Sequence, residues 1–264
     1  MSKSVASEAE AVNQAIQDPA PQIANPKSLQ VELLRGFFDG SEWQTSASVR
    51  ELTGVDEEAL AAFDIRNGVS YSEYMTHLLK RSVVDIGSTR VEDNPAILDN
   101  LIIGDRDVLF LGTLKATYGR YREFELICRE CEGHNDIKVD LEDDFKVDES
   151  SEDLRVPLSA TLRDGTVVQL NYPTGADSQY VSKKSKTTAE QNTLMLSRCA
   201  VLPGMDRPQA EVWAKNLNLA DRNKLVKTIL SAQPGPRMEE VETQCAHCNA
   251  KLVLALDWVS LLFG

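Results

Sequence analysis

Hydrophobic residues recur at helical spacing along much of the first half of the chain. The pattern predicts a helix after Thr53, whose hydroxyl can cap a first turn that holds three acids, Asp56–Glu58. A second helix is predicted from about Ser72 to Val84, with His77 as a packed or partly exposed side chain. A third is predicted from near Leu98 to Gly119, where the glycine ends it.

Strand-like alternation takes over in the second half. Charged and apolar residues alternate from Arg122 to Cys128 and from Ile137 to Leu141, which predicts two strands joined by a cysteine-bearing turn. Two more alternating runs flank Asp164-Gly165, a strong hairpin signal. The strands of this hairpin are predicted over Val156–Leu162 and Thr166–Tyr172. Three further helices are predicted at about Thr188–Cys199, Pro208–Asn216 and Ala220–Ala232.

These patterns predict an α+β fold in three parts. Residues 1–27 are polar and proline-containing, without apolar periodicity, and are expected to form a disordered tail. Residues 28–120 are expected to form a mainly helical region. Residues 121–264 are expected to form an α+β region with a hairpin insert, whose two ends carry zinc-ribbon-like hairpin knuckles.

Charge and hydropathy narrow the possible partners. The net charge of −13 over 264 residues argues against binding to a phosphate backbone, and the one compact basic cluster is Lys183, Lys184 and Lys186. No signal-like segment opens the chain, and the longest apolar stretch, Leu252–Phe263, is too short to span a bilayer. We therefore expect a soluble cytosolic protein without a membrane partner. Leu252–Phe263, with Trp258, is either a docking surface or a segment packed inside the cysteine-bearing arm.

Two Cys-x-x-Cys pairs, Cys128/Cys131 and Cys245/Cys248, are the main candidates for chemistry. They lie in a weak internal repeat, because Asp105–Leu109 resembles Asp221–Leu225 at a similar distance before each pair. Zinc prefers four tetrahedral ligands, so two facing turns complete a site that one turn leaves half coordinated. We expect one shared structural Zn²⁺ on Cys128, Cys131, Cys245 and Cys248, with His134 and His247 as possible replacements.

Other chemistry finds little support in the sequence. A redox dithiol normally opens a helix, whereas both pairs are followed by strand-like alternation. Cys199 stands alone on an apolar helix, where buried packing is expected. Phosphate-binding glycine loops, nucleophile elbows and metalloprotease histidine pairs are missing from the sequence, which predicts a protein that is not an enzyme.

The order of several short motifs over residues 45–264 resembles the T4-type baseplate proteins of contractile-tailed bacteriophages, small hub-assembly proteins with a Cys-pair motif. These motifs are Arg50–Glu58, Leu78–Lys80, Cys128–Leu141, Asp164-Gly165, Pro173–Gly175 and Cys245–Cys248. The resemblance implies a role in assembling or forming the baseplate hub, as a chaperone or a minor subunit. It carries over no catalytic residue, and only the four cysteines as a zinc site.

The resemblance also implies partners and a location. The partners would be other baseplate or tail proteins, met in the host cytoplasm during assembly and in the baseplate of the virion tail. The alternative function is a zinc-ribbon regulator that binds nucleic acid through Arg129 and Lys183–Lys186. The strongly acidic composition makes nucleic acid the less favoured partner.

Overall fold

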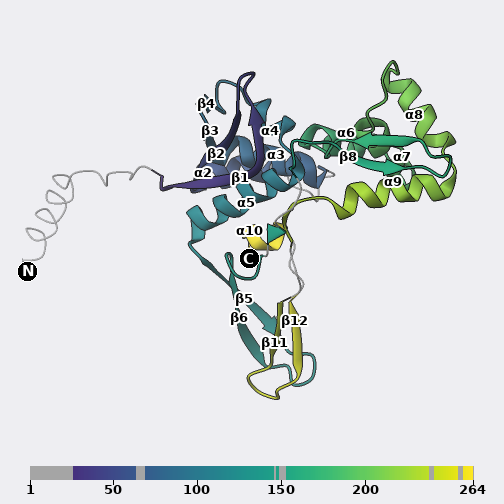
Figure 1. Cartoon of the computed structure of the whole chain (residues 1–264). Coiled ribbons are helices and arrows are strands. Elements are labelled where there is room, and N and C mark those ends of the chain that lie inside the picture. The colour runs from purple at the N-terminus through teal and green to yellow at the C-terminus, as the bar shows by residue number, and fades with distance from the viewer. Residues whose placement is uncertain are drawn as a thin grey trace, which may run out of the picture.

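The computed structural model describes residues 26–63, 69–145, 147–148, 153–237, 241–254 and 258–263. Helices and small antiparallel sheets share these residues, so the predicted α+β fold class is confirmed. Two helix-containing bodies lie side by side, and an arm of paired strands extends away from them (Figure 1). Residues 1–25, which make up most of the predicted polar tail, lie outside the described residues.

The first body combines a four-stranded sheet with four helices. Its strands, in sheet order, are β1 (Ser28–Phe38), β2 (Trp43–Arg50), β3 (Val83–Ile86) and β4 (Thr89–Arg90). Its helices are α2 (Gly54–Ala61), α3 (Tyr71–Ser82), α4 (Ile97–Asn100) and α5 (Ile103–Tyr118). The last two, α4 and α5, divide the helix predicted from near Leu98 to Gly119. The helix α2 begins where predicted, because the Asp56 carboxylate accepts hydrogen bonds from the amide and the hydroxyl of Thr53.

The sheet is the main departure from the sequence pattern, which indicates a mainly helical region over residues 28–120. Its longest strand conceals the expected alternation, because the pairing register of β1 shifts between Glu32 and Phe37. Such an irregularity moves the following side chains to the other face of the sheet and breaks a period of two. Within this shift, the backbone amides of Leu34, Arg35 and Gly36 donate to the buried carboxylate of Asp105, at the start of α5.

The second body contains one hairpin and four helices. The hairpin strands are β8 (Leu158–Thr161) and β9 (Val167–Leu170), and Gly165 takes a φ of +89° in the predicted turn. The helices are α6 (Gly175–Lys184), α7 (Thr188–Cys199), α8 (Arg207–Asn216) and α9 (Leu219–Ser231). Each begins after a capping residue whose side chain accepts a backbone hydrogen bond: Thr174, Thr187, Asp206 and Asn218.

The arm consists of two antiparallel hairpins that lie next to each other (Figure 1). The first pairs β5 (Tyr121–Ile127) with β6 (His134–Asp140), and the second pairs β11 (Val241–Gln244) with β12 (Lys251–Leu254). A further short pairing joins β7 (Val147–Asp148) to β10 (Gly235–Pro236). The first hairpin follows α5 and the second follows α9, so each body is followed along the chain by one hairpin of the arm.

Each body has its own hydrophobic core. The first is built around α3, α5 and the sheet, and the second around α7, α9 and the β8–β9 hairpin. The segment Leu252–Phe263 was predicted to form a docking surface or to pack inside the arm, and neither alternative describes all of it. Leu252 packs in the arm beside Cys128 and Cys245, but Leu261 and Leu262 of α10 (Trp258–Phe263) are buried in the core of the first body. The side chain of Trp258 lies outside the described part of the chain.

Among the described residues, none of the helices is long and apolar enough to cross a membrane.

Candidate metal centre

The turn of the first arm hairpin places two thiols on one side of a tight loop. The Cys128 amide donates to the carbonyl of Gly133 over 2.9 Å, and the Glu132 amide donates back to the carbonyl of Cys128 over 2.9 Å. Glu132 takes a left-handed conformation with φ of 56°. This backbone turn brings Cys131 round to face the same space as Cys128.

The second hairpin repeats this turn. The Cys245 amide donates to the carbonyl of Ala250 over 2.8 Å, and the Asn249 amide donates to the carbonyl of Cys245 over 2.9 Å. Asn249 has a φ of 59°, so both turns have a left-handed residue at the same distance after their first cysteine. Two unlike sequences thus form one backbone shape, which indicates a common purpose for the thiols.

The two turns face each other and bring all four predicted cysteines together. Their sulfur atoms lie within 4.8 Å of one another, and this is a set that could hold a metal ion. Two cross-turn distances between sulfur atoms are 3.7 Å, from Cys128 to Cys248, and 3.6 Å, from Cys131 to Cys245. These separations exceed the roughly 2.05 Å of a disulfide, and all four cysteines are free. One cysteine of each turn, Cys128 or Cys245, is buried, and the other is exposed.

Crowding makes the protonation states of these thiols unequal. Burial raises the pKa of Cys245, but hydrogen bonds from the amides of His247 and Cys248 outweigh it and lower this pKa to about 6. At Cys131 the amide of Gly133 lowers the pKa, but the neighbouring thiols outweigh it and raise this pKa to about 12. Four thiolates at this spacing repel one another, so a bound cation is needed for all four to be charged together.

Residues around the sulfurs hold the two turns against each other. The Asn135 amide nitrogen donates to the carbonyl of Gly133 over 2.8 Å, and its oxygen accepts from the amide of Ala246 over 2.9 Å. The ring of His247 lies against Gly133, so closely that a Cβ at this glycine would meet the ring at 2.4 Å. The spacing of the cysteines does not predict that Asn135 links the two turns, because one of its hydrogen-bond partners lies in each turn.

The two arm histidines, predicted as possible replacement ligands, do not join the sulfur cluster. The Nε2 atom of His247 lies 3.0 Å from the backbone oxygen of His134, and the Nδ1 atom of His134 contacts the carboxylate of Glu125. The four sulfurs thus make up the metal-binding set found among the described residues.

Other residues noted in the sequence lie elsewhere. Cys199 is buried, as expected, with its sulfur 3.7 Å from that of Met195, and burial raises its pKa to about 12. His77 stacks on Phe63 with ring centroids 3.5 Å apart. Within the basic cluster, the Lys183 ammonium forms an ion pair with Glu73 at 3.3 Å.

Comparison with known proteins gives one match. The model of a family described as T4 bacteriophage base plate protein matches residues 41–263. No curated protein and no solved structure matches the chain. The match covers most of the chain and includes both cysteine pairs, the second body and all of the first body except β1. The chain therefore belongs to the T4 bacteriophage base plate protein family.

Proposed function

We propose that this protein is a non-enzymatic component or assembly factor of the baseplate hub, and that one structural zinc ion locks its two bodies together. The observation that carries the proposal is the four-sulfur cluster, which joins cysteines 114 residues apart, such as Cys131 and Cys245, in a baseplate protein. The partners are other proteins of the phage tail. The protein meets them in the host cytoplasm during assembly and in the baseplate of the virion.

The geometry of the sulfurs fits zinc. A zinc–sulfur bond of about 2.3 Å places the corners of a tetrahedron about 3.8 Å apart. The cross-turn distances of 3.7 Å and 3.6 Å are close to that value without any rearrangement. Thiolates are soft ligands, and a set of four favours zinc over the hard cations that prefer oxygen.

A four-sulfur site supports a structural role. Catalytic zinc keeps one position open for water or substrate, whereas four cysteines fill every position of a tetrahedral ion. In zinc-finger peptides, structural zinc contributes an apparent folding free energy of about 10–16 kcal/mol, which is comparable to the stability of a whole domain. The small apolar cluster around Cys128, Cys245 and Leu252 is too limited to provide that amount on its own.

The first test is the metal content of the purified chain, measured by inductively coupled plasma mass spectrometry. We expect one zinc per chain, lost in Cys128→Ser and equally in Cys245→Ser, because each body supplies half of the ligands. The matched control is Cys199→Ala, which removes a thiol outside the cluster and keeps the metal. A chain that binds no metal, or two ions lost independently by the two variants, contradicts the shared site.

The second test addresses the hub role. We expect the zinc-loaded chain to co-purify with baseplate hub or tail-tube proteins expressed together with it. A chain that ignores every tail component would contradict the role in assembly. Mass spectrometry of finished virions and of baseplate intermediates then separates a permanent subunit, present in both, from a chaperone, present only in the intermediates.

A further inference from the structure

The two bodies are built on the same plan, and the likeness begins at the helix that follows each hairpin. In the first body the Asp56 carboxylate accepts from the amide and the hydroxyl of Thr53, at 2.9 and 3.0 Å. In the second the Asp177 carboxylate accepts from the amide and the hydroxyl of Thr174, at 2.9 and 2.8 Å. A glycine follows each threonine, so α2 and α6 start from equivalent positions.

The next helix of each body supplies an arginine to this aspartate. The Nε atom of Arg81, at the end of α3, donates to Asp56 over 2.8 Å. The Nε atom of Arg198, at the end of α7, donates to Asp177 over 2.5 Å. Both helices then continue into a backbone pairing with the second hairpin strand, through β3 against β2 and through an isolated bridge between Ala200 and Leu170.

The last long helix of each body repeats two more contacts. Asp105 in α5 and Asp221 in α9 each accept a hydrogen bond from a backbone amide in the hairpin of their own body. Gly36 is one such donor to Asp105, and Arg163 is the donor to Asp221. The following arginines bind equivalent threonines, Arg106 to Thr76 at 2.6 Å and Arg222 to Thr193 at 2.9 Å. With the two knuckles that follow, these contacts make α5 and α9 counterparts in two copies of one unit.

The two helices α5 and α9 differ in how one apolar face is covered. Phe110, Leu114 and Tyr118 are one turn apart and form a stripe along this helix. The Tyr118 hydroxyl donates to the backbone oxygen of Leu262 over 2.7 Å, and Leu261 and Leu262 are buried in the same core as Phe110 and Leu114. The short apolar helix α10 therefore lies against the Tyr118 end of the stripe and shares the core to which Phe110 and Leu114 belong, and Figure 1 shows it beside α5.

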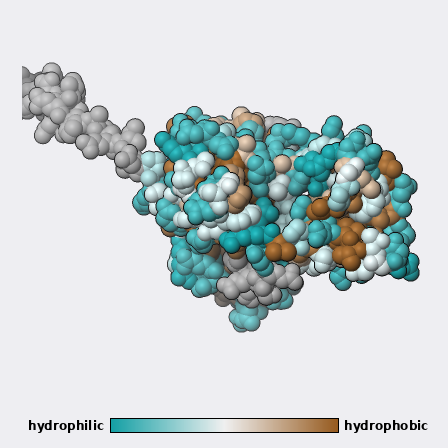
Figure 2. Space-filling model, turned by 45° about the horizontal axis from the view of Figure 1, so that its top comes forward, coloured by the Kyte–Doolittle hydropathy of each residue, from teal (hydrophilic) through white to brown (hydrophobic). Residues whose placement is uncertain are grey.

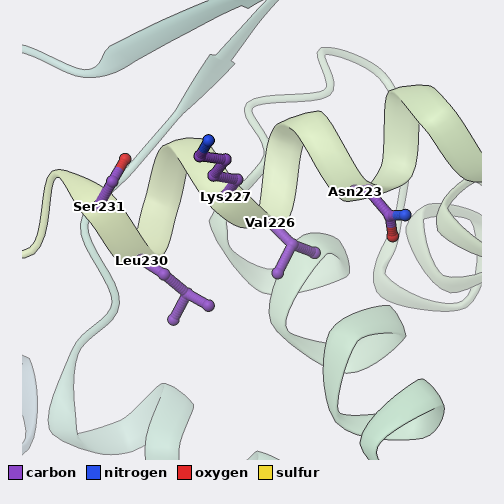
Figure 3. A pocket seen from close by; sticks show the side chains of 5 residues that line it. All are labelled: Asn223, Val226, Lys227, Leu230 and Ser231. Atoms are coloured by element: carbon purple, nitrogen blue, oxygen red, sulfur yellow. The ribbon is translucent and has the colours of Figure 1, made fainter.

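On α9 the equivalent stripe is only partly covered, because Val226 packs against the edge of the second core while the next turn is exposed. Counted from the matching aspartates Asp105 and Asp221, its members are Val226 and Leu230, and Leu230 is 60% exposed. Both side chains project from the same side of the helix (Figure 3). A surface hollow runs along them, lined by Asn223, Val226, Lys227, Leu230 and Ser231. In the view of Figure 2, hydrophobic residues gather on the surface of the second body.

We propose that this stripe, Val226 and Leu230 with its flank Lys227, is the docking site for a short apolar helix of another tail protein. The occupant has the chemistry of α10, with adjacent leucine-like side chains for the stripe and an acidic flank to pair with Lys227. The first body gives the model for this occupant, since the Tyr118 end of its own stripe binds α10. The proposal rests on the assembly role above for the source of the helix, but not for the surface itself.

A second copy of this chain does not fit as the occupant. Each chain has one α10 and two stripes, and its α10 is held on the first body. The Arg122 side chain also donates to the backbone oxygen of Leu261 over 2.9 Å. A copy that lent its α10 to a neighbour would withdraw Leu261 and Leu262, which are 0% and 2% exposed, from its own core. We therefore assign the occupant to a different protein rather than to the α10 of a second copy.

The test uses the full chain and a fluorescent peptide with the sequence of residues 258–263, flanked by glutamates. We expect saturable binding in fluorescence anisotropy, weakened at least about tenfold by Leu230→Gln because the main aliphatic contact is lost. The matched control is Leu219→Gln on the same helix, where the side chain is 70% exposed but outside the stripe. This control is expected to bind within about twofold of the unchanged chain.

Three outcomes overturn the docking site. They are no saturable binding up to about 1 mM peptide, equal binding by the Leu230→Gln and unchanged chains, and self-association of the unchanged chain that Leu230→Gln abolishes. The last would make a second copy the occupant. Because the peptide needs neither metal nor hub proteins, failure of this surface is distinguishable from failure of the assembly role.

Discussion

Buried aspartates at the third position of a helix stabilise the link between consecutive elements. Asp56 is 1% exposed and accepts hydrogen bonds from Thr53, Arg50 and Arg81. Burial raises the pKa of Asp56, but the hydrogen bonds from Arg50 and Thr53 outweigh it, so this pKa lies below its ordinary value. The charged carboxylate is the form that stabilises the fold.

We expect Asp56→Asn to lower the free energy of unfolding by about 1–3 kcal/mol at neutral pH. Two arginines lose their charged partner, although both keep some access to water. The matched control is Glu57→Gln, an exposed acid in the same helical turn, which is expected to change stability by less than about 0.5 kcal/mol. Urea denaturation of both variants measures the effect, and equal stabilities would contradict it.

The same aspartate has a defined pH signature. Because its folded pKa is lowered, its contribution is fully present above the unfolded pKa of about 3.9 and is lost as the pH falls below it. The stability difference between the unchanged chain and Asp56→Asn is therefore expected to shrink between about pH 5 and pH 3. Protonation of the cysteines affects both proteins alike and cancels in this difference. A constant difference over that range contradicts the assignment.

Local spacing predicts the caps and the cysteines, but not the partners that lie far along the chain. Thr53 was predictable as a cap because its partner is three residues away. Arg81 lies 25 residues from Asp56, and Asn135 lies 111 residues from Ala246, so no local pattern pairs them. The same limit explains why the weak repeat of Asp105 and Asp221 was visible only in part.

At the scale of elements, the backbone of the first body closely approaches the segment that leads into the second hairpin of the arm. A Cβ at Gly104, near the start of α5, would meet the backbone oxygen of Pro234 at 2.2 Å. A Cβ at Gly235 would in turn meet the Cα atom of Gly104 at 2.8 Å. The helix α5 and the strand β10 can lie this close only because neither glycine has a side chain.

We expect Gly104→Ala to destabilise the chain by about 1–3 kcal/mol, because the backbone that it meets must move. The matched control is Gly54→Ala at the start of α2, where a Cβ meets nothing within 4 Å. Alanine favours a helix over glycine, so the control is expected to be neutral or to stabilise by up to about 1 kcal/mol. Thermal unfolding of the two variants distinguishes them, and similar losses would show that the contact is loose.

The elements themselves were largely predictable, with exceptions that have physical causes. Capping residues and apolar spacing predicted α2, α3, α7, α8 and α9 with small shifts at their ends. The helix predicted from near Leu98 is divided into α4 and α5, and α6 was not predicted. The sheet of the first body was missed because the bulge in β1 breaks its alternation. The place of α10 was missed because its contacts, with Tyr118 and Arg122, lie in a distant part of the chain.

At the scale of the whole molecule, the two copies of the unit meet directly, as where Lys183 pairs with Glu73, and again at the proposed metal centre of the arm. The contacts between the knuckles are few: the sulfurs, the bonds of Asn135, the ring of His247 on Gly133, and a small apolar cluster around Leu252. Each body has a separate core that does not include the cysteines. Loss of the ion should therefore open the arm without unfolding either body.

Removal of zinc with a strong chelator is expected to speed amide hydrogen exchange in the arm at least about tenfold, as in a locally opened unit. The affected amides are those of Cys128, Cys245 and Ala246, whose acceptors lie in the knuckles. Exchange in α7 should stay within about twofold, because its contacts lie in the second core. Cys128→Ser should exchange fast before the chelator is added and respond little to it. Uniform acceleration through both bodies would show instead that the ion supports the whole fold, and that the arm is not an independent clamp.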